Sequence, residues 1–138
     1  MRTNYEGPSL ILGEIANRFE TRGTGSIIGI SSVAGDRGRA SNYIYGSAKS
    51  GFTAFLSGLR NRLHRSNVSV LTVLPGFVRT KMTGHLELPN VLTSSPESVS
   101  NIIYKNKNRS KSIYPIPWGA IMFLIRSLPE SVFKRIKF

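Results

Sequence analysis

Two short apolar segments separated by one long amphipathic stretch constrain the fold of this chain most strongly. Residues 26–32 (SIIGISS) and 68–74 (VSVLTVL) are rich in β-branched side chains and carry no charge, which is typical of strands buried on both faces of a parallel sheet. Between them, apolar residues recur at intervals of three and four, so we expect one helix over residues 42–65. This order predicts an α/β fold with a parallel pair and a right-handed crossover.

The segments on either side carry weaker patterns. Residues 8–22 have helical spacing and end in the glycines of RGTGS, which predicts a helix with a glycine stop. Ser95 and Pro96 have the chemistry of a helix N-terminus. The prolines of SIYPIP (112–117) predict an edge strand. Residues 118–128 are apolar on nearly every side, which predicts a helix buried against the domain, a partner or a membrane surface.

Length, charge and the rare residue types exclude several classes. A chain of 138 residues accommodates one domain with a modest core. Without cysteine it has no disulfide, thiolate ligand or thiol nucleophile, and two histidines with one aspartate predict no metal site. We expect no signal peptide and no membrane span. The net charge of +12 is concentrated in the second half, which suits nucleic acid, an anionic membrane, a phosphorylated substrate or a solvated lysine-rich face.

Polar residues gather at one edge of the predicted sheet. Ser32 closes the first strand, Pro75-Gly76 follows the second, and Tyr45 opens the helix between them. The carboxyl ends of parallel strands share one edge, and ligands of α/β proteins bind there. Lys49 follows Tyr45 by four residues, so the two side chains are expected to be neighbours on one helix face.

A tyrosine beside a lysine is suited to proton transfer. A free phenol has a pKa of about 10 and is a poor acid-base group near neutral pH, but a nearby ammonium stabilises the phenolate. We therefore expect Tyr45 to act as a general acid-base and the Ser32 hydroxyl to bind a substrate oxygen on which charge develops. Tyr43 is expected to pack instead. Such a site suits a carbonyl or an alcohol and requires a bound hydride carrier.

This combination resembles the short-chain dehydrogenase/reductase family. Ser32, Tyr45 and Lys49, with the tyrosine thirteen positions after the serine, match its Ser…Tyr-x-x-x-Lys signature. The segment ISSVAG around Ser32 is similar to the catalytic-serine segment of the family, and PGFVRT (75–80) is similar to its nicotinamide-side segment. Asn4, in TNYEG, matches the fourth member of the catalytic tetrad, although an asparagine before a helix is also a common N-cap.

The resemblance implies a Rossmann-type doubly wound parallel sheet and an NAD(P)-dependent oxidoreductase that interconverts a ketone and a secondary alcohol. By matched position, Tyr45 would be the acid-base, Ser32 would orient the substrate oxygen, Lys49 would assist the tyrosine and bind the nicotinamide ribose, and Asn4 would help to hold a proton-relay water. The implied cofactor contacts are Tyr45, Lys49, Pro75, Gly76, Val78 through its backbone and Thr80 through its hydroxyl.

Only the second half of the family pattern is matched. The glycine-rich turn TGxxxGxG and the first four strands have no counterpart in these residues, and GTG at 23–25 follows a helix instead of a strand. We therefore expect residues 1–138 to form a partial catalytic domain, with residues 83–138 as its substrate loop and C-terminal segment. The residues that distinguish NAD from NADP would lie in the absent half. In an alternative reading, the chain is a non-catalytic fragment that acts only within a larger enzyme.

Three segments, residues 35–63, PGFVRTKM (75–82) and the ending LPESVFKRIKF, resemble one subgroup of the family, which includes the keto-reductase of decaprenylphosphoryl-ribose epimerisation. This finer resemblance implies a small-molecule or lipid-linked sugar substrate, here a polyprenyl-phosphate sugar. It also implies a cytoplasmic protein with peripheral membrane contact through residues 118–138. The long helix that carries Tyr45 often forms dimers in the family, which implies a homo-oligomer.

Two rival classes make different demands on the residues. A Ser-His-Asp hydrolase would need Asp36 to orient His64 or His85, and the sequence has no G-x-S-x-G elbow. A basic module could bind a membrane or a nucleic acid. The basic run KNKNRSK (105–111) has no interleaved aromatic side chain, so we expect no nucleic-acid partner. Arg37 and Arg39 are interpreted either as phosphate ligands or as part of a solvated loop.

Overall fold

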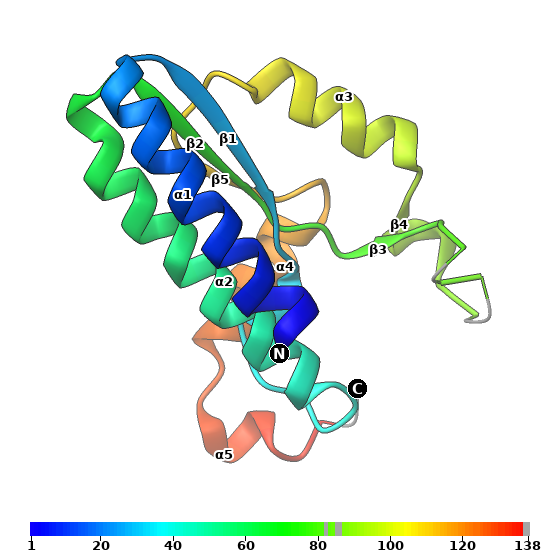
Figure 1. The fold of residues 1–138 in the computed structure, drawn as a ribbon. Helices are drawn as coiled ribbons and strands as arrows, with labels where there is room; N and C mark the ends of the chain where they lie inside the picture. Colours follow the sequence, from blue (N-terminus) through cyan, green and yellow to red (C-terminus); the bar gives the residue numbers. More distant parts are fainter. Residues whose placement is uncertain (82, 85–86, 137–138) are drawn as a thin grey trace.

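Helices and strands alternate along most of the chain in the computed structural model, which describes all residues except 82, 85–86 and 137–138 (Figure 1). The elements are α1 (Gly7–Arg22), β1 (Gly25–Ile30), α2 (Tyr43–Arg62), β2 (Val68–Val73), β3 (Phe77–Val78), β4 (Thr93–Ser94), α3 (Pro96–Asn106), β5 (Ser112–Ile113), α4 (Trp118–Ser127) and α5 (Glu130–Phe133). The expected helix over 42–65 continues past α2 as a 3-10 turn, Leu63–Arg65. Both long strands end earlier than the apolar segments do, because Ser31, Ser32 and Leu74 lie beyond the ladder.

The main sheet has the order β1-β2-β5, and all of its pairings are parallel. β1 and β2 pair in register over their whole length, with Ile27 opposite Val70 and Ile30 opposite Val73. The short strands β3 and β4 form a separate parallel pair. The α/β class and the parallel pair around α2 are therefore confirmed. Among the strands that the structure describes, β1 has one neighbour, so its other edge is open.

Helices cover the two faces of the sheet unequally. α1 and α2 run side by side over one face (Figure 1), where Phe52 and Leu56 of α2 pack on Ile27 and Val70. On the opposite face, α3 packs on β2 and β5 only, through Ile102 and Ile103 against Leu71, Val73 and Ile113. Beyond the carboxyl ends of the strands, α4 packs Trp118 and Met122 on Val33 and Leu74. Within the described residues, no helix covers the part of the second face that belongs to β1.

The expectation that both long strands are buried on both faces is right for β2 and wrong for β1. In β2 every residue except Ser69 is buried, whereas exposed and buried residues alternate along β1. Ile28 is 37% exposed and Ile30 is 52% exposed. Their opposite partners, Leu71 and Val73, lie beneath α3, which does not extend over β1. The exposure of Ile28 and Ile30 thus follows from the absence of a neighbour on that side.

The helix α4 is buried on one side only. Trp118 and Met122, one turn apart, are buried, whereas Phe123 is 72% exposed and Leu124 is 66% exposed. Helical geometry places these two exposed residues on the face opposite the buried pair. In the part of the chain that the structure describes, no helix combines the length and the apolar character needed to cross a bilayer.

Candidate functional site

Ser32 lies just past the carboxyl end of β1, at the edge of the sheet where the sequence predicted it. The N–H of Ser31 still bonds the carbonyl of Val73 at 2.8 Å, and Ser32 then adopts an extended backbone and begins the 3-10 turn Val33–Gly35. The Ser32 side chain is buried, and its Oγ accepts the N–H of Ala34 at 3.1 Å. This bond fixes the oxygen and leaves the hydroxyl proton of Ser32 as a donor.

The turn after Ser32 lies directly on α2 because glycines occupy the contact. A Cβ on Gly46 would lie 2.7 Å from the carbonyl oxygen of Ala34, and a Cβ on Gly35 would lie 2.6 Å from the backbone nitrogen of Ser50. Any side chain at these positions would push the turn and the helix apart. The pair of glycines therefore brings the backbone around Ser32 against the helical turns that carry the tyrosine and the lysine.

Ser31, which the sequence did not single out, ties the same two segments together. Its hydroxyl donates to the carbonyl of Lys49 at 3.0 Å and lies 2.6 Å from Oγ1 of Thr53, and its residue is only 2% exposed. Buried polar groups in proteins are nearly always paired in this way. The one available signal is alternation along a strand, which points Ser31 and Ser32 in different directions.

Tyr45 and Lys49 are neighbours on α2, as their spacing predicts. The Nζ of Lys49 lies 5.8 Å from the centroid of the Tyr45 ring and donates to the carbonyl of Ile30 at 3.0 Å. Burial lowers the pKa of the Lys49 ammonium below its ordinary value of 10.5. The expectation that Tyr43 packs is wrong, because Tyr43 is 65% exposed. It belongs to the first turn of α2, ahead of the residues that the 33–35 turn covers.

Asn4 lies beside both of these residues. It belongs to a π-helical turn, Arg2–Glu6, in which its N–H bonds the carbonyl of Met1, so it is not an N-cap. Asn4 and Tyr45 line a pocket of about 430 Å³, and Asn4 and Lys49 line a groove of about 550 Å³ along β1. Asn42 also lines the first pocket. The buried Oδ1 of Asn42 has no hydrogen-bond partner among the described residues.

Pro75 and Gly76 connect the carboxyl end of β2 to the turn after Ser32 and to α4. The carbonyl of Pro75 accepts the N–H of Val33 at 3.1 Å, so this segment lies beside the turn that follows Ser32. Gly76 packs beneath the Trp118 ring, where an added Cβ would come within 1.8 Å of a ring carbon. Both residues are therefore at the carboxyl edge, and α4 covers one of them.

Val78 and Thr80 lie farther along the same segment. Val78 belongs to β3, and its carbonyl accepts the hydroxyl of Thr83 at 2.6 Å. The N–H of Thr80 donates to Oγ1 of Thr83 at 3.0 Å, and the Thr80 side chain is exposed. Thr83 thus organises this turn through its single hydroxyl. The carbonyl of Val78 therefore already has a partner within the chain, and the Thr80 hydroxyl lies 3.4 Å from Oγ1 of Thr83.

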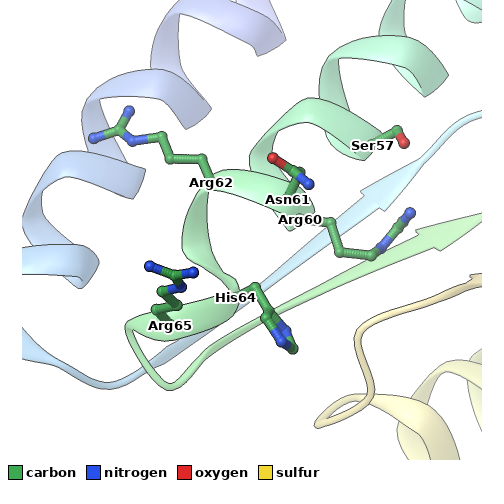
Figure 2. Close-up of a pocket in the computed structure, with 6 residues that line it drawn as sticks. All are labelled: Ser57, Arg60, Asn61, Arg62, His64 and Arg65. Carbon is green, nitrogen blue, oxygen red and sulfur yellow. The ribbon is translucent and has the colours of Figure 1, made fainter.

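The other candidate residues have structural partners. Figure 2 shows the basic cleft around His64, at the opposite end of α2 from Tyr45. Its Arg60 donates to the carbonyl of Val70 and to the Thr72 hydroxyl, and its Arg62 bonds Glu20 of α1. These arginines tie α2 to β2 and to α1.

Asp36 and Arg37 connect the turn after Ser32 with the C-terminal segment. Asp36 accepts the hydroxyl of Tyr114 at 2.9 Å, so it does not orient a histidine as a hydrolase would require; His85 lies outside the described residues. Arg37 is neither solvated nor open to phosphate, because its side chain is only 15% exposed. Its partners are the carbonyls of Ile125 and Leu128 at 2.5 and 2.6 Å, Glu130 at 2.9 Å, and the ring of Phe133 at 3.9 Å. No group of three histidine, aspartate or glutamate side chains gathers among the described residues.

These features define a class of protein: a Rossmann-type α/β fold with a serine, a tyrosine and a lysine at the carboxyl edge of its parallel sheet. The family described as short chain dehydrogenase matches residues 1–90. The chain belongs to this family, as the sequence resemblance predicted.

Individual relatives agree with the family match. The chain is 37% identical over 138 residues to an uncharacterized oxidoreductase of Mycobacterium tuberculosis, covering 99% of this chain and 55% of that protein. It is 33% identical to an uncharacterized oxidoreductase of Streptomyces coelicolor, covering 98% and 54%. A solved short-chain dehydrogenase from Sphingobium yanoikuyae, in complex with NADPH, superposes with a TM-score of 0.73 at 27% identity over 93% of this chain and 55% of that one. The chain therefore spans about half the length of the relatives it matches.

Proposed function

We propose that this chain carries the catalytic side of an NAD(P)-dependent oxidoreductase that interconverts a ketone and a secondary alcohol of a small-molecule substrate. The observation that carries the proposal is the pairing of Tyr45 with Lys49 on α2, next to the Ser32 turn that two glycines hold against the same helix. Family membership supports it, and the structural relative bound to NADPH supports the choice of cofactor.

The residues fit one end of a nicotinamide cofactor. Asn4 and Lys49 line the groove along β1 with a donor and an amide that suit ribose hydroxyls. None of the 138 residues supplies the glycine-rich turn that binds a pyrophosphate in this family. A bound nicotinamide would give or accept the hydride. The chain itself would bind the substrate and move the proton.

The proton would move through Tyr45. Its side chain is 39% exposed and lines the pocket beside Asn4, so a substrate oxygen can reach the phenolic hydroxyl. The Ser32 hydroxyl keeps a free proton to donate to that oxygen, because its own lone pair is engaged by Ala34. The Lys49 ammonium favours the phenolate form while the proton is away. Each residue thus has one role in the transfer of a proton to or from the substrate oxygen.

The Tyr45→Phe variant of the complete enzyme tests this role. We expect turnover to fall at least about 100-fold, the lower range for loss of a general acid-base, while the affinity for NADPH changes little. Tyr43→Phe is the matched control and should retain activity, since this exposed ring lies two residues before Tyr45 and so points to the other side of the helix from Lys49. Reduction of a ketone panel, followed by NADPH absorbance, measures both variants. Undiminished turnover by Tyr45→Phe would remove the assignment.

A second proposal concerns a membrane surface. The outward face of α4 exposes Phe123 and Leu124, and the chain carries a net charge of +12, a combination that suits an anionic lipid interface. We expect the chain to sediment with anionic liposomes and the double variant F123S/L124S to sediment less. An exposed pair on α1, in the variant L10S/I11S, is the control. Equal partitioning of all three proteins would contradict the proposal.

The finer substrate proposal, a polyprenyl-phosphate sugar, depends on the subgroup resemblance alone. The relatives named above are described only as oxidoreductases or dehydrogenases. A ketone panel that includes a lipid-linked sugar separates this substrate from simpler carbonyl compounds. Faster reduction of the lipid-linked sugar than of the same sugar without its lipid would support the finer proposal.

A further inference from the structure

A polar cleft lies at the amino end of the main sheet, away from the proposed chemistry. It consists of two cavities of about 690 and 580 Å³, and His64 lines both of them. The last turns of α2 form the first cavity, and the starts of β1 and β2 with the loop before β5 form the second. At 1.5 Å per residue, Asn61 in the first cavity lies about 24 Å along α2 from Tyr45. The cleft is therefore separate from the candidate active site.

Arg60 and His64 are four residues apart and lie on the strand side of the helix end. Figure 2 shows Arg62 reaching toward α1 instead, where it has an acidic partner. The Nε of Arg60 donates to the carbonyl of Val70 at 3.0 Å, and one terminal nitrogen donates to the Thr72 hydroxyl at 2.5 Å. The other terminal nitrogen of Arg60 and the His64 ring have no hydrogen-bond partner within the described residues. Two donors thus remain open on one side of the helix end.

The first cavity carries positive charge without a carboxylate to balance it. Among the described residues, no aspartate or glutamate lines either cavity. The helix dipole favours cations at a helix C-terminus, which accounts for the sign of the charge but not for the open nitrogen of Arg60. Burial lowers the pKa of the Arg60 guanidinium, because its charged form is partly removed from water. A bound anion would offset this cost.

The second cavity offers neutral hydrogen-bonding groups. The Oγ of Ser110 accepts a backbone N–H of β2 at 3.1 Å and keeps its proton to donate. The side-chain amides of Asn67 and Asn108 are exposed and have no hydrogen-bond partner in the described part of the chain. The hydroxyl of Ser26 donates to the carbonyl of Lys107, which fastens this loop to β1. Amides and hydroxyls both donate and accept, so they suit the hydroxyl groups of a ligand.

We propose that this cleft binds a soluble phosphate ester that carries hydroxyl groups. The phosphate lies between Arg60 and His64, because a guanidinium presents a planar fork to phosphate oxygens and an imidazole adds an N–H donor. The hydroxyl groups reach Asn67, Asn108 and Ser110 in the second cavity. Both volumes fall within the range of about 300–1,000 Å³ that is common for small-molecule sites. The lining is almost entirely polar, which disfavours an apolar ligand.

The position of the cleft favours a soluble ester over a lipid headgroup. The helix α4, with its exposed apolar face, lies beyond the carboxyl ends of the strands, whereas the cleft lies at their amino ends. A membrane bound at α4 would therefore meet the other end of the sheet. Binding in the cleft also requires neither a nicotinamide cofactor nor a substrate at Tyr45, so it is independent of the proposed oxidoreductase activity.

The experiment compares three probes on the 138-residue chain at one fixed ionic strength. These are glucose 6-phosphate, inorganic phosphate and glucose, and NMR titration followed at the Asn61 and Asn67 amides measures each affinity. We expect a Kd tighter than about 1 mM for glucose 6-phosphate. Inorganic phosphate should bind at least tenfold more weakly, and glucose should not bind measurably. Only the ester engages both cavities at once.

His64→Ala and Asn108→Ala test the two cavities separately. His64→Ala should weaken the binding of glucose 6-phosphate by about tenfold, the effect of losing a hydrogen bond to a charged group. Asn108→Ala should weaken it by about threefold, as for a neutral hydrogen bond, and leave the affinity for inorganic phosphate unchanged. Arg18→Gln is the matched control, since it removes a cation from α1 far from the cleft, and it should bind like the parent chain. Circular dichroism confirms that each variant is folded.

Four results would overturn the proposal. These are the absence of binding, equal affinity for glucose 6-phosphate and inorganic phosphate, unchanged binding by a folded His64→Ala variant, and an equal loss in Arg18→Gln. The last result would indicate a general attraction of anions to a chain with a net charge of +12. Sedimentation of the chain with phosphatidylinositol vesicles that His64→Ala abolishes would also contradict it, because the occupant would then be a lipid headgroup.

Discussion

Asp36 shows how a single half-buried carboxyl can connect two distant segments. It follows the turn that contains Ser32 and accepts the hydroxyl of Tyr114, which lies just after β5. Burial raises the pKa of Asp36 above its ordinary value of 3.8, and the bond from Tyr114 partly offsets this increase. Burial also raises the pKa of the Tyr114 phenol. Burial thus favours the protonated Asp36 carboxyl, whereas the bond from Tyr114 favours the carboxylate, and burial is the larger effect.

Asp36→Asn should change the pH dependence of stability. Since the folded pKa of Asp36 lies above the unfolded one, its contribution is fully present below about pH 4 and is lost as the pH rises through the folded pKa. The amide keeps an oxygen acceptor for Tyr114 and does not ionise. Relative to the parent chain, the variant should gain stability above that range, by the roughly 0.5–2 kcal/mol common for single substitutions.

Urea unfolding from pH 3.5 to pH 8 measures the difference between the two chains. The comparison cancels the carboxylates that both chains share, such as Glu130 near Arg37. A constant difference across the range would show that Asp36 titrates alike in the folded and unfolded states.

Sequence spacing predicted which candidate side chains are neighbours on a helix, but it did not predict what those side chains contact. The four-residue interval placed Tyr45 and Lys49 together because helix geometry is local. The partner of Lys49, the carbonyl of Ile30, could not be predicted, since it depends on the open edge of β1. Tyr43 was predicted to pack, but the turn at 33–35 contacts α2 near Gly46 and Ser50 and leaves Tyr43 exposed. Local periodicity carries no information about which neighbours are present.

Arg37 illustrates the same limit at the level of helices. It joins the turn after β1 to the carboxyl end of α4 and to α5, across 88 to 93 residues of sequence. A cation at a helix C-terminus satisfies carbonyls that lack intrahelical partners. The apolar run at 118–128 predicts the helix α4, but it does not predict that Arg37 binds the carboxyl end of this helix. Sequence patterns predict helices and strands, but they do not predict hydrogen bonds between residues that are far apart in the sequence.

Arg37→Ala should loosen the attachment of α4 and α5. The variant loses bonds to two carbonyls and to Glu130, and it removes the cation above Phe133. We expect the free energy of unfolding to fall by about 1–3 kcal/mol, the range for charged hydrogen bonds. Trypsin should also cut residues 118–136 sooner. Arg18→Ala, which breaks an exposed pair with Glu14, is the control and should change stability by less than about 1 kcal/mol. Equal losses in both variants would contradict the role of Arg37.

The molecule as a whole has the α/β fold of the short-chain dehydrogenase family and spans about half the length of the relatives it matches. The sequence predicted the α/β class, the parallel pair and the family, because these depend on periodicity and motif spacing. It could not predict that β1 lies half exposed, since burial depends on parts of the relatives that these residues do not match. Among the described strands, β1 has a neighbour on one side only.

The 138 residues alone should bind NADPH weakly. They offer Lys49 and Asn4 at the ribose end but no glycine-rich turn for the pyrophosphate. We expect a Kd weaker than about 1 mM, equivalent to a binding free energy less favourable than roughly −4 kcal/mol. Titration of NADPH fluorescence measures it, with Lys49→Met as the control for any binding at the ribose end. A micromolar Kd would show that these residues suffice for the cofactor.

The open edge of β1 has a last consequence, for the behaviour of the chain in concentrated solution. An unpaired strand with the sequence GSIIGI is a template on which copies can stack into insoluble aggregates. Two features oppose this: the Lys49 ammonium blocks the carbonyl of Ile30, and the net charge of +12 makes copies repel. Added salt weakens the repulsion between copies. We therefore expect the chain to precipitate at high ionic strength. Lys49 would then help to keep the chain soluble, in addition to its proposed role beside Tyr45.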